Sequence, residues 1–217
     1  MGRLIVIDAI AATVVLALWY FCFARLNRRR GLKALRSVER ACDGRGRVLD
    51  TQWLGASRVQ ARLGFAVHWF ENVKITVRLL PRPLPFQWLL SLWRRERETV
   101  TFEADLDYSP RFNLNVLRHR WLSQSRSTLL PRTREWTITH PGPVVLTTRS
   151  QWTHELPAVV NTLMTSRGHN LLSVRFRPDS PQLAATVALE DLSDGETAAA
   201  FLNVLQELAA GASTSHQ

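Results

Sequence analysis

The longest hydrophobic run of the chain lies at its start. Residues 4–24 are almost entirely apolar, and Asp8 is the one side chain among them that is charged at neutral pH. A helix rises about 1.5 Å per residue, so a run of this length spans roughly 30 Å, the thickness of the hydrocarbon core of a bilayer. Trp19 and Tyr20 lie towards its C-terminal end, where amphipathic rings favour the membrane interface. We predict a transmembrane anchor over residues 1–24.

A cleaved signal peptide is the alternative to this anchor. Its positively charged start would be Met1-Gly2-Arg3 alone. The apolar run ends in the bulky Trp19-Tyr20-Phe21, whereas signal cleavage sites carry small residues. The pattern therefore favours a retained helix.

A cluster of basic residues follows the apolar run and predicts its orientation. One arginine, Arg3, precedes the run. Six cations follow it within the window that sets topology: Arg25, Arg28, Arg29, Arg30, Lys33 and Arg36. We predict a single-pass protein of the cell (plasma) membrane, with its N-terminus outside and its C-terminal domain in the cytoplasm. The six cations are predicted to contact anionic headgroups, although a role in topology alone explains them equally well.

The basic segment continues to residue 43, and residues 31–42 within it have helical spacing. Leu32, Leu35 and Val38 share one stripe, with Lys33 and Arg36 off it. This pattern predicts a short helix that leaves the membrane surface. Residues 43–46 contain two glycines and an aspartate, which are typical of a turn after a helix.

Alternating polar and apolar residues dominate the rest of the chain. Val73, Ile75 and Val77 alternate with Lys74 and Thr76, which is the period of a half-buried strand. Glycine, proline or serine separates further apolar runs into four predicted hairpins: 47–54 with 58–65, 99–108 with 112–121, 135–139 with 144–149, and 171–177 with 183–189. We therefore predict an α+β domain over residues 44–210, built on a largely antiparallel sheet.

Two segments in the second half have helical spacing. Residues 154–167 keep apolar positions three and four apart and end at Gly168. Residues 194–210 follow Ser193, which forms a capping-box pattern with Glu196. Both helices are predicted to pack on the sheet, and residues 211–217 are predicted to form a disordered tail.

A short aromatic segment interrupts the predicted strands. Residues 83–93 are too few to cross a bilayer but carry large apolar side chains, and arginines follow them. This composition is typical of a helix lying in the membrane interface. The predicted contacts are Phe86, Trp88, Leu89, Trp93, Arg94 and Arg95. A core helix over the sheet, or a docking site for another membrane protein, are the alternatives.

The second predicted hairpin carries the one cluster of acidic residues that suggests chemistry. Glu103, Asp105 and Asp107 alternate along a strand, so they share a face. The turn would bring Asn113 and Asn115 opposite them. Such oxygen ligands suit a hard divalent cation, or acid–base chemistry. An acidic strand is more often the wet face of a sheet, so we predict no metal and no cofactor here.

Charge and motifs narrow the function without identifying it. The net charge of +10 is uneven, because residues 178–217 hold six acidic side chains and no Lys or Arg. A basic body beside an apolar anchor suits an anionic membrane better than nucleic acid, which we regard as an unlikely partner. No nucleophile motif, glycine-rich phosphate loop or zinc-hydrolase pattern is present. We predict a non-catalytic, membrane-associated interaction or scaffold protein. The alternative is a membrane-bound enzyme or lipid- or small-ligand-binding domain that uses the acidic hairpin face.

Overall fold

The computed structural model describes residues 2–42, 46–65, 70–107, 109–110, 112–118, 136–139, 144–149, 171–192 and 195–214. Its helices are α1 (Gly2–Ala41), α2 (Pro85–Trp93), the 3-10 helix η2 (Leu189–Leu192) and α5 (Gly195–Thr214). Its strands are β1 (Gly46–Trp53), β2 (Arg58–Phe65), β3 (Phe70–Arg78), β4 (Thr99–Leu106), β5 (Leu114–Arg118), β6 (Trp136–Thr139), β7 (Val144–Arg149), β8 (Leu171–Phe176) and β9 (Leu183–Ala188). The α+β class predicted from the pattern is confirmed.

The strands form one sheet in the order β1-β2-β3-β4-β9-β8-β5-β7-β6. Every pairing between them is antiparallel. Three predicted hairpins are present: β1–β2, β6–β7 and β8–β9. In these three cases, a short turn with Gly, Pro or Ser correctly predicted the pairing of the strands beside it.

The predicted hairpin of residues 99–108 with 112–121 is wrong. β4 pairs with β3 and β9, whereas β5 pairs with β7 and β8. β9 and β8 therefore stand between β4 and β5. Three strand spacings separate the two backbones, which is about 14 Å.

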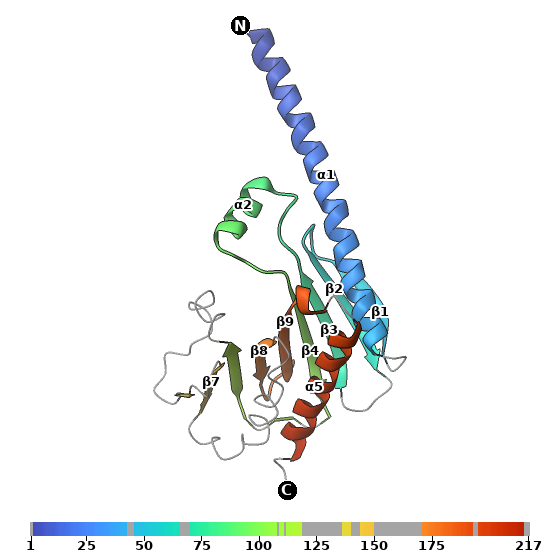
Figure 1. Ribbon diagram of the computed structural model, residues 1–217, viewed down its shortest axis with the longest axis vertical. Helices are drawn as coiled ribbons and strands as arrows, with labels where there is room; N and C mark the ends of the chain where they lie inside the picture. Colours follow the sequence, from blue (N-terminus) through green and yellow to red (C-terminus); the bar gives the residue numbers. More distant parts are fainter. Residues whose placement is uncertain are drawn as a thin grey trace.

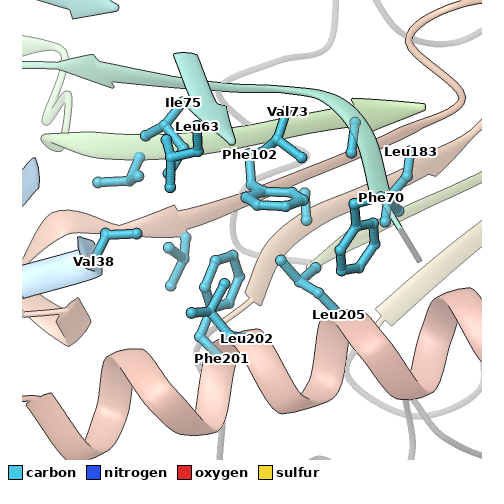
Figure 2. Close-up of a cluster of buried hydrophobic side chains, with 14 of the residues drawn as sticks. Val38, Leu63, Phe70, Val73, Ile75, Phe102, Leu183, Phe201, Leu202 and Leu205 are labelled. Carbon is cyan, nitrogen blue, oxygen red and sulfur yellow. The ribbon is translucent and has the colours of Figure 1, made fainter. Parts of the chain in front are cut away.

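The core lies on the sheet face that α5 and the C-terminal half of α1 cover (Figure 1). Phe102 of β4 is fully buried near its centre, and its ring meets that of Phe70 edge-on at 5.5 Å between centroids. Figure 2 shows these rings between the strands and the side chains of Phe201, Leu202 and Leu205 from α5. The alternation of apolar and polar residues along the strands therefore sets the buried face.

The chain does not break between the apolar run and the basic segment. The sequence predicted a separate short helix at residues 31–42, but α1 is continuous over 40 residues. Gly31, expected to begin that helix, lies inside α1, where a Cβ atom would sit 2.9 Å from the ring of Trp53. The glycine allows α1 to approach the β1–β2 hairpin closely.

The C-terminal part of α1 is a core helix of the body. Ala34, Leu35, Val38 and Cys42 are buried, and α1 contacts α5 and strands β1 to β3. Burial raises the pKa of the Cys42 thiol to about 11, and the nearby Glu39 adds to the shift. The body therefore includes residues that the pattern had assigned to a juxtamembrane segment.

The last helix was predicted correctly in place and type. α5 begins at Gly195 and continues to Thr214, so residues 211–214 are helical and do not belong to a disordered tail. The predicted helix at residues 154–167 lies outside the described residues.

Candidate membrane interface

The N-terminal half of α1 projects away from the body (Figure 1). Within the described residues, α1 is the helix that is long and apolar enough to cross a membrane, and its most apolar stretch has no share buried against the protein. Ile10, Val14 and Leu18, for example, are 51–60% exposed. This surface requires a cover that the described part of the chain does not supply.

Helix α2 packs against α1 where the apolar run ends. The ring of Trp88 lies 5.9 Å from that of Trp19 and 6.0 Å from that of Phe23, measured between centroids. The indole nitrogen of Trp19 donates a hydrogen bond of 3.0 Å to the backbone oxygen of Arg82. Trp88, one of the predicted lipid contacts, is half-buried and fastens α2 to α1.

The opposite side of α2 is an exposed apolar face. Phe86, Leu89 and Trp93 are 78%, 66% and 82% exposed. Their spacing of three and four residues places them on one side of the helix. The helix begins with Pro85 in its first turn, where the missing N–H costs nothing, and Arg94 caps its end. Arg94 and Arg95 are exposed there, beside this apolar face.

Asn27 fixes α1 to the body just below that level. Its side chain is fully buried in the middle of the basic cluster. The amide nitrogen donates to the backbone oxygens of Ala56 and Leu80, at 3.1 and 3.0 Å, and the amide oxygen accepts from Arg82 at 3.2 Å. The hydrogen bonds to these partners offset the cost of burying the amide. They tie α1 to the β1–β2 turn and to the segment after β3.

Glu98 completes the same network. One carboxylate oxygen accepts from the backbone N–H of Leu80 at 3.2 Å and from the guanidinium of Arg82. The other oxygen lies 3.5 Å from Arg30 of α1. Glu98 and Arg82 are only 11% and 13% exposed at their side chains, so the pair is shielded from water and satisfied by hydrogen bonds.

The remaining predicted cations lie on the exposed side of α1. Arg25, Arg28, Arg29, Lys33 and Arg36 are all exposed, whereas Asn27 and Gly31 face the body. Arg25 and Arg28 line a recess of about 530 Å³ between α1 and the β1–β2 turn. Arg30 differs from the others because it pairs with Glu98.

A second recess, of about 350 Å³, lies between α2 and the strands beneath it. Arg58, Arg78 and Arg94 line it together with Glu96. The guanidinium of Arg78 lies 3.5 Å from the carboxylate of Glu96, which offsets part of the positive charge.

The acidic strand is separated from its predicted partners. Glu103 and Asp105 lie in β4 and Asp107 just after it, whereas Asn113 and Asn115 lie just before and in β5, and strands β9 and β8 stand between β4 and β5. Lys74 stands beside Glu103 in the β3–β4 register, and Asn72 donates to Asp105 at 3.1 Å. The structure therefore does not bring these five residues into one site.

An arginine on a nearby strand, Arg175 of β8, interacts electrostatically with Glu103 of the acidic strand. Burial and the neighbouring Arg177 lower the pKa of Arg175 on β8, while Glu103 acts in the opposite direction. Among the described residues, no group of three or more His, Cys, Asp or Glu is arranged to hold a metal ion. The acidic face is thus a row of mixed charges on the sheet surface.

The residues that join α1 to the body were missed by the sequence analysis. Asn27 lies among arginines, and Glu98 lies in an Arg- and Glu-rich segment, so both resemble solvated surface residues. An uncharged amide inside a run of cations was the one signal available.

Comparison with known proteins adds no family. No protein-family model matches the sequence, and no curated protein matches it. The fold and the interface geometry define the chain as an α+β protein in which the described residues include one helix long and apolar enough to span a membrane.

Proposed function

We propose that this chain is a membrane-anchored, non-catalytic interaction protein whose body is held directly against the bilayer surface. The N-terminal half of α1 is its anchor, and α2 is a second, interfacial contact. The observation that carries the proposal is the packing of α2 on α1 at Trp19 and Phe23, with Phe86, Leu89 and Trp93 left exposed.

The position of α2 along α1 supports this arrangement. Residues 4–24 match the hydrocarbon thickness, so Trp19 and Phe23 belong to its last two turns. A helix packed there lies at the boundary between hydrocarbon and headgroups. Its exposed aromatic and leucine side chains would enter the acyl region, and Arg94 and Arg95 would lie near phosphates.

The packing also supports a retained helix. Removal of residues up to about 24 would take away Trp19 and Phe23, and the ring of Trp88 would lose both partners. The remainder of α1 is part of the core through Leu35 and Val38. The apolar run also ends in the bulky Trp19-Tyr20-Phe21, whereas signal cleavage sites carry small residues.

Charge supports a cytoplasmic body. The exposed cations of α1 lie on the side of the apolar run nearest the body, and Arg3 lies on the other side. The headgroup layer is about 5–7 Å deep, which corresponds to four or five helical residues after Ala24. Arg25, Arg28 and Arg29 fall within that depth, whereas Lys33 and Arg36 fall below it when α1 stands upright.

A labelling experiment on the full chain in nanodiscs tests the α2 contact. Leu89→Cys and Leu49→Cys, each in a Cys22→Ser background, are labelled with the polarity-sensitive dye NBD. Leu49, on the edge strand β1, is the matched control for Leu89 on α2, because the two leucines are 69% and 66% exposed. We expect blue-shifted emission, quenched by nitroxide lipids, at position 89 and water-like emission at position 49.

Water-like emission at both positions would contradict the interfacial contact. The apolar face of α2 would then be free for another membrane protein. The full chain is required for this test, because α1 supplies part of the core of the body.

A further inference from the structure

The recess between α1 and the β1–β2 turn combines apolar and cationic walls. Tyr20, Phe21 and Ala24 line its upper part, and Arg25 and Arg28 line its lower part. Trp53, Gly55 and Ala56 of the hairpin close the other side. No acidic side chain is among these eight lining residues, so the positive charge of the two arginines is not neutralised inside the recess.

Two glycines shape this recess: Gly31 allows a close approach at one end, and Gly55 leaves space at the hairpin tip. Gly31 lets Trp53 approach the backbone of α1, where a Cβ atom would meet the indole at 2.9 Å. Gly55 adopts a positive φ of 91° in the turn, and beyond its two chain neighbours no atom lies within 4 Å of the place where its Cβ would be. The hairpin therefore closes on α1 at Trp53 and leaves space at its tip.

An apolar stripe continues from the recess along α1. Ile10, Val14 and Phe21 lie on the same side of the helix as Arg25 and Arg28, because these positions are three, four or seven residues apart. The three apolar side chains are 60%, 51% and 70% exposed. A ligand in the recess would thus have cations at its polar end and a hydrocarbon surface above.

We infer that this recess is a binding site for one anionic phospholipid, whose phosphate lies between Arg25 and Arg28 and whose acyl chains follow the apolar stripe of α1. The inference rests on the proposed membrane position of the body, which puts Arg25 and Arg28 at headgroup depth. An anionic phospholipid matches both ends of the site, since guanidinium groups bind phosphate oxygens and the stripe covers acyl chains. A soluble phosphate would use only the lower half.

Native mass spectrometry of the full chain in detergent micelles tests the site. Phosphatidylglycerol and phosphatidylcholine with the same acyl chains are titrated separately. The wild type is expected to retain one phosphatidylglycerol per chain in preference to phosphatidylcholine. The Arg25→Gln/Arg28→Gln variant is expected to retain it about tenfold to thirtyfold less well.

The matched control removes the same charge from the same helix. Lys33 and Arg36 are exposed on α1 but do not line the recess, so Lys33→Gln/Arg36→Gln is expected to retain the lipid as the wild type does. Equal losses in the two variants would show diffuse charge attraction and overturn the site. Equal retention of the two lipids by the wild type would overturn it as well.

A competition arm separates the lipid from a free anion. Millimolar inorganic phosphate is expected to leave the bound phosphatidylglycerol in place. Displacement by phosphate would overturn the lipid assignment in favour of a soluble anion. The NBD measurement on α2 is independent of these arginines, so failure of the lipid site and failure of the proposed membrane contact are distinguishable.

Discussion

Residues 5–18 and residues 27–41 belong to the same helix, yet their apolar side chains have different surroundings. Leu16 is 55% exposed and Val14 51%, whereas Leu35 is 4% exposed and Val38 3%. In the first segment apolar residues surround the helix, and in the second the buried apolar residues form one face opposite Lys33 and Arg36, while Leu32 stays 41% exposed. The distribution of apolar residues around the axis, and not their presence, distinguishes the exposed half of α1 from the half that packs on the body.

The largest expected effect is a difference in unfolding free energy between two Leu→Ala substitutions, one in each half of α1. Leu35→Ala removes a core side chain between α1 and the body and is expected to cost about 2–5 kcal/mol of unfolding free energy. Leu16→Ala, in the exposed half, is expected to leave the stability of the body unchanged. Denaturant unfolding of the detergent-solubilised full chain, followed by circular dichroism, measures both. Equal costs would contradict the division of α1 into two halves.

A smaller effect is expected at the junction between the halves. Asn27→Ala removes the side-chain donor of the part-buried backbone oxygen of Ala56 and one of the two donors to that of Leu80, and it takes the amide acceptor from Arg82, at a cost of about 1–3 kcal/mol. The neighbouring Leu26 is 37% exposed, and Leu26→Ala serves as the control with little expected change. The same unfolding measurement applies. If the two variants lose the same stability, the amide does not fix α1 to the body.

The smallest expected effect is a difference in chemical reactivity, at Cys42. Its pKa of about 11 lies above the ordinary 9.0, so the thiol keeps its proton through the range in which a solvated cysteine ionises. In a Cys22→Ser variant, alkylation of the folded chain is expected to stay slow between pH 7 and 10. The same variant unfolded in guanidinium should react with a midpoint near pH 9. A midpoint near 9 in the folded chain would contradict the burial of Cys42.

Most of the secondary structure was accessible from local pattern, and the exception is instructive. The strands among the described residues begin close to their predicted positions, because period-two alternation and turn residues are local signals. The pairing of β4 with β5 failed, since Ser109 and Pro110 suggest a hairpin but the register of β4 with β9 depends on a strand some eighty residues later in the chain. The residues of a turn do not indicate which strands distant in sequence will pair.

The candidate interface was predictable in composition but not in contacts. The exposed Phe86, Leu89 and Trp93 stood out as an aromatic segment, and their neighbour Trp88 looked the same in the sequence. Only the three-dimensional packing separates Trp88, which faces Trp19 and Phe23, from the other three. The five residues of the predicted polar site do not come together, because that prediction depended on the hairpin of β4 with β5 that the structure does not form.

The unbroken course of α1 has a mechanical consequence. The helix is about 60 Å long, and Asn27 together with the buried face of residues 31–42 fastens its lower part to the sheet. Transmembrane helices tilt to match the thickness of the bilayer around them. With α1 in the proposed transmembrane position, a body fastened to it without a hinge would turn with it, so a change of about 10° in tilt would swing the far edge of the sheet by several ångströms. Membrane thickness would thereby set the angle at which the sheet is presented to the solvent.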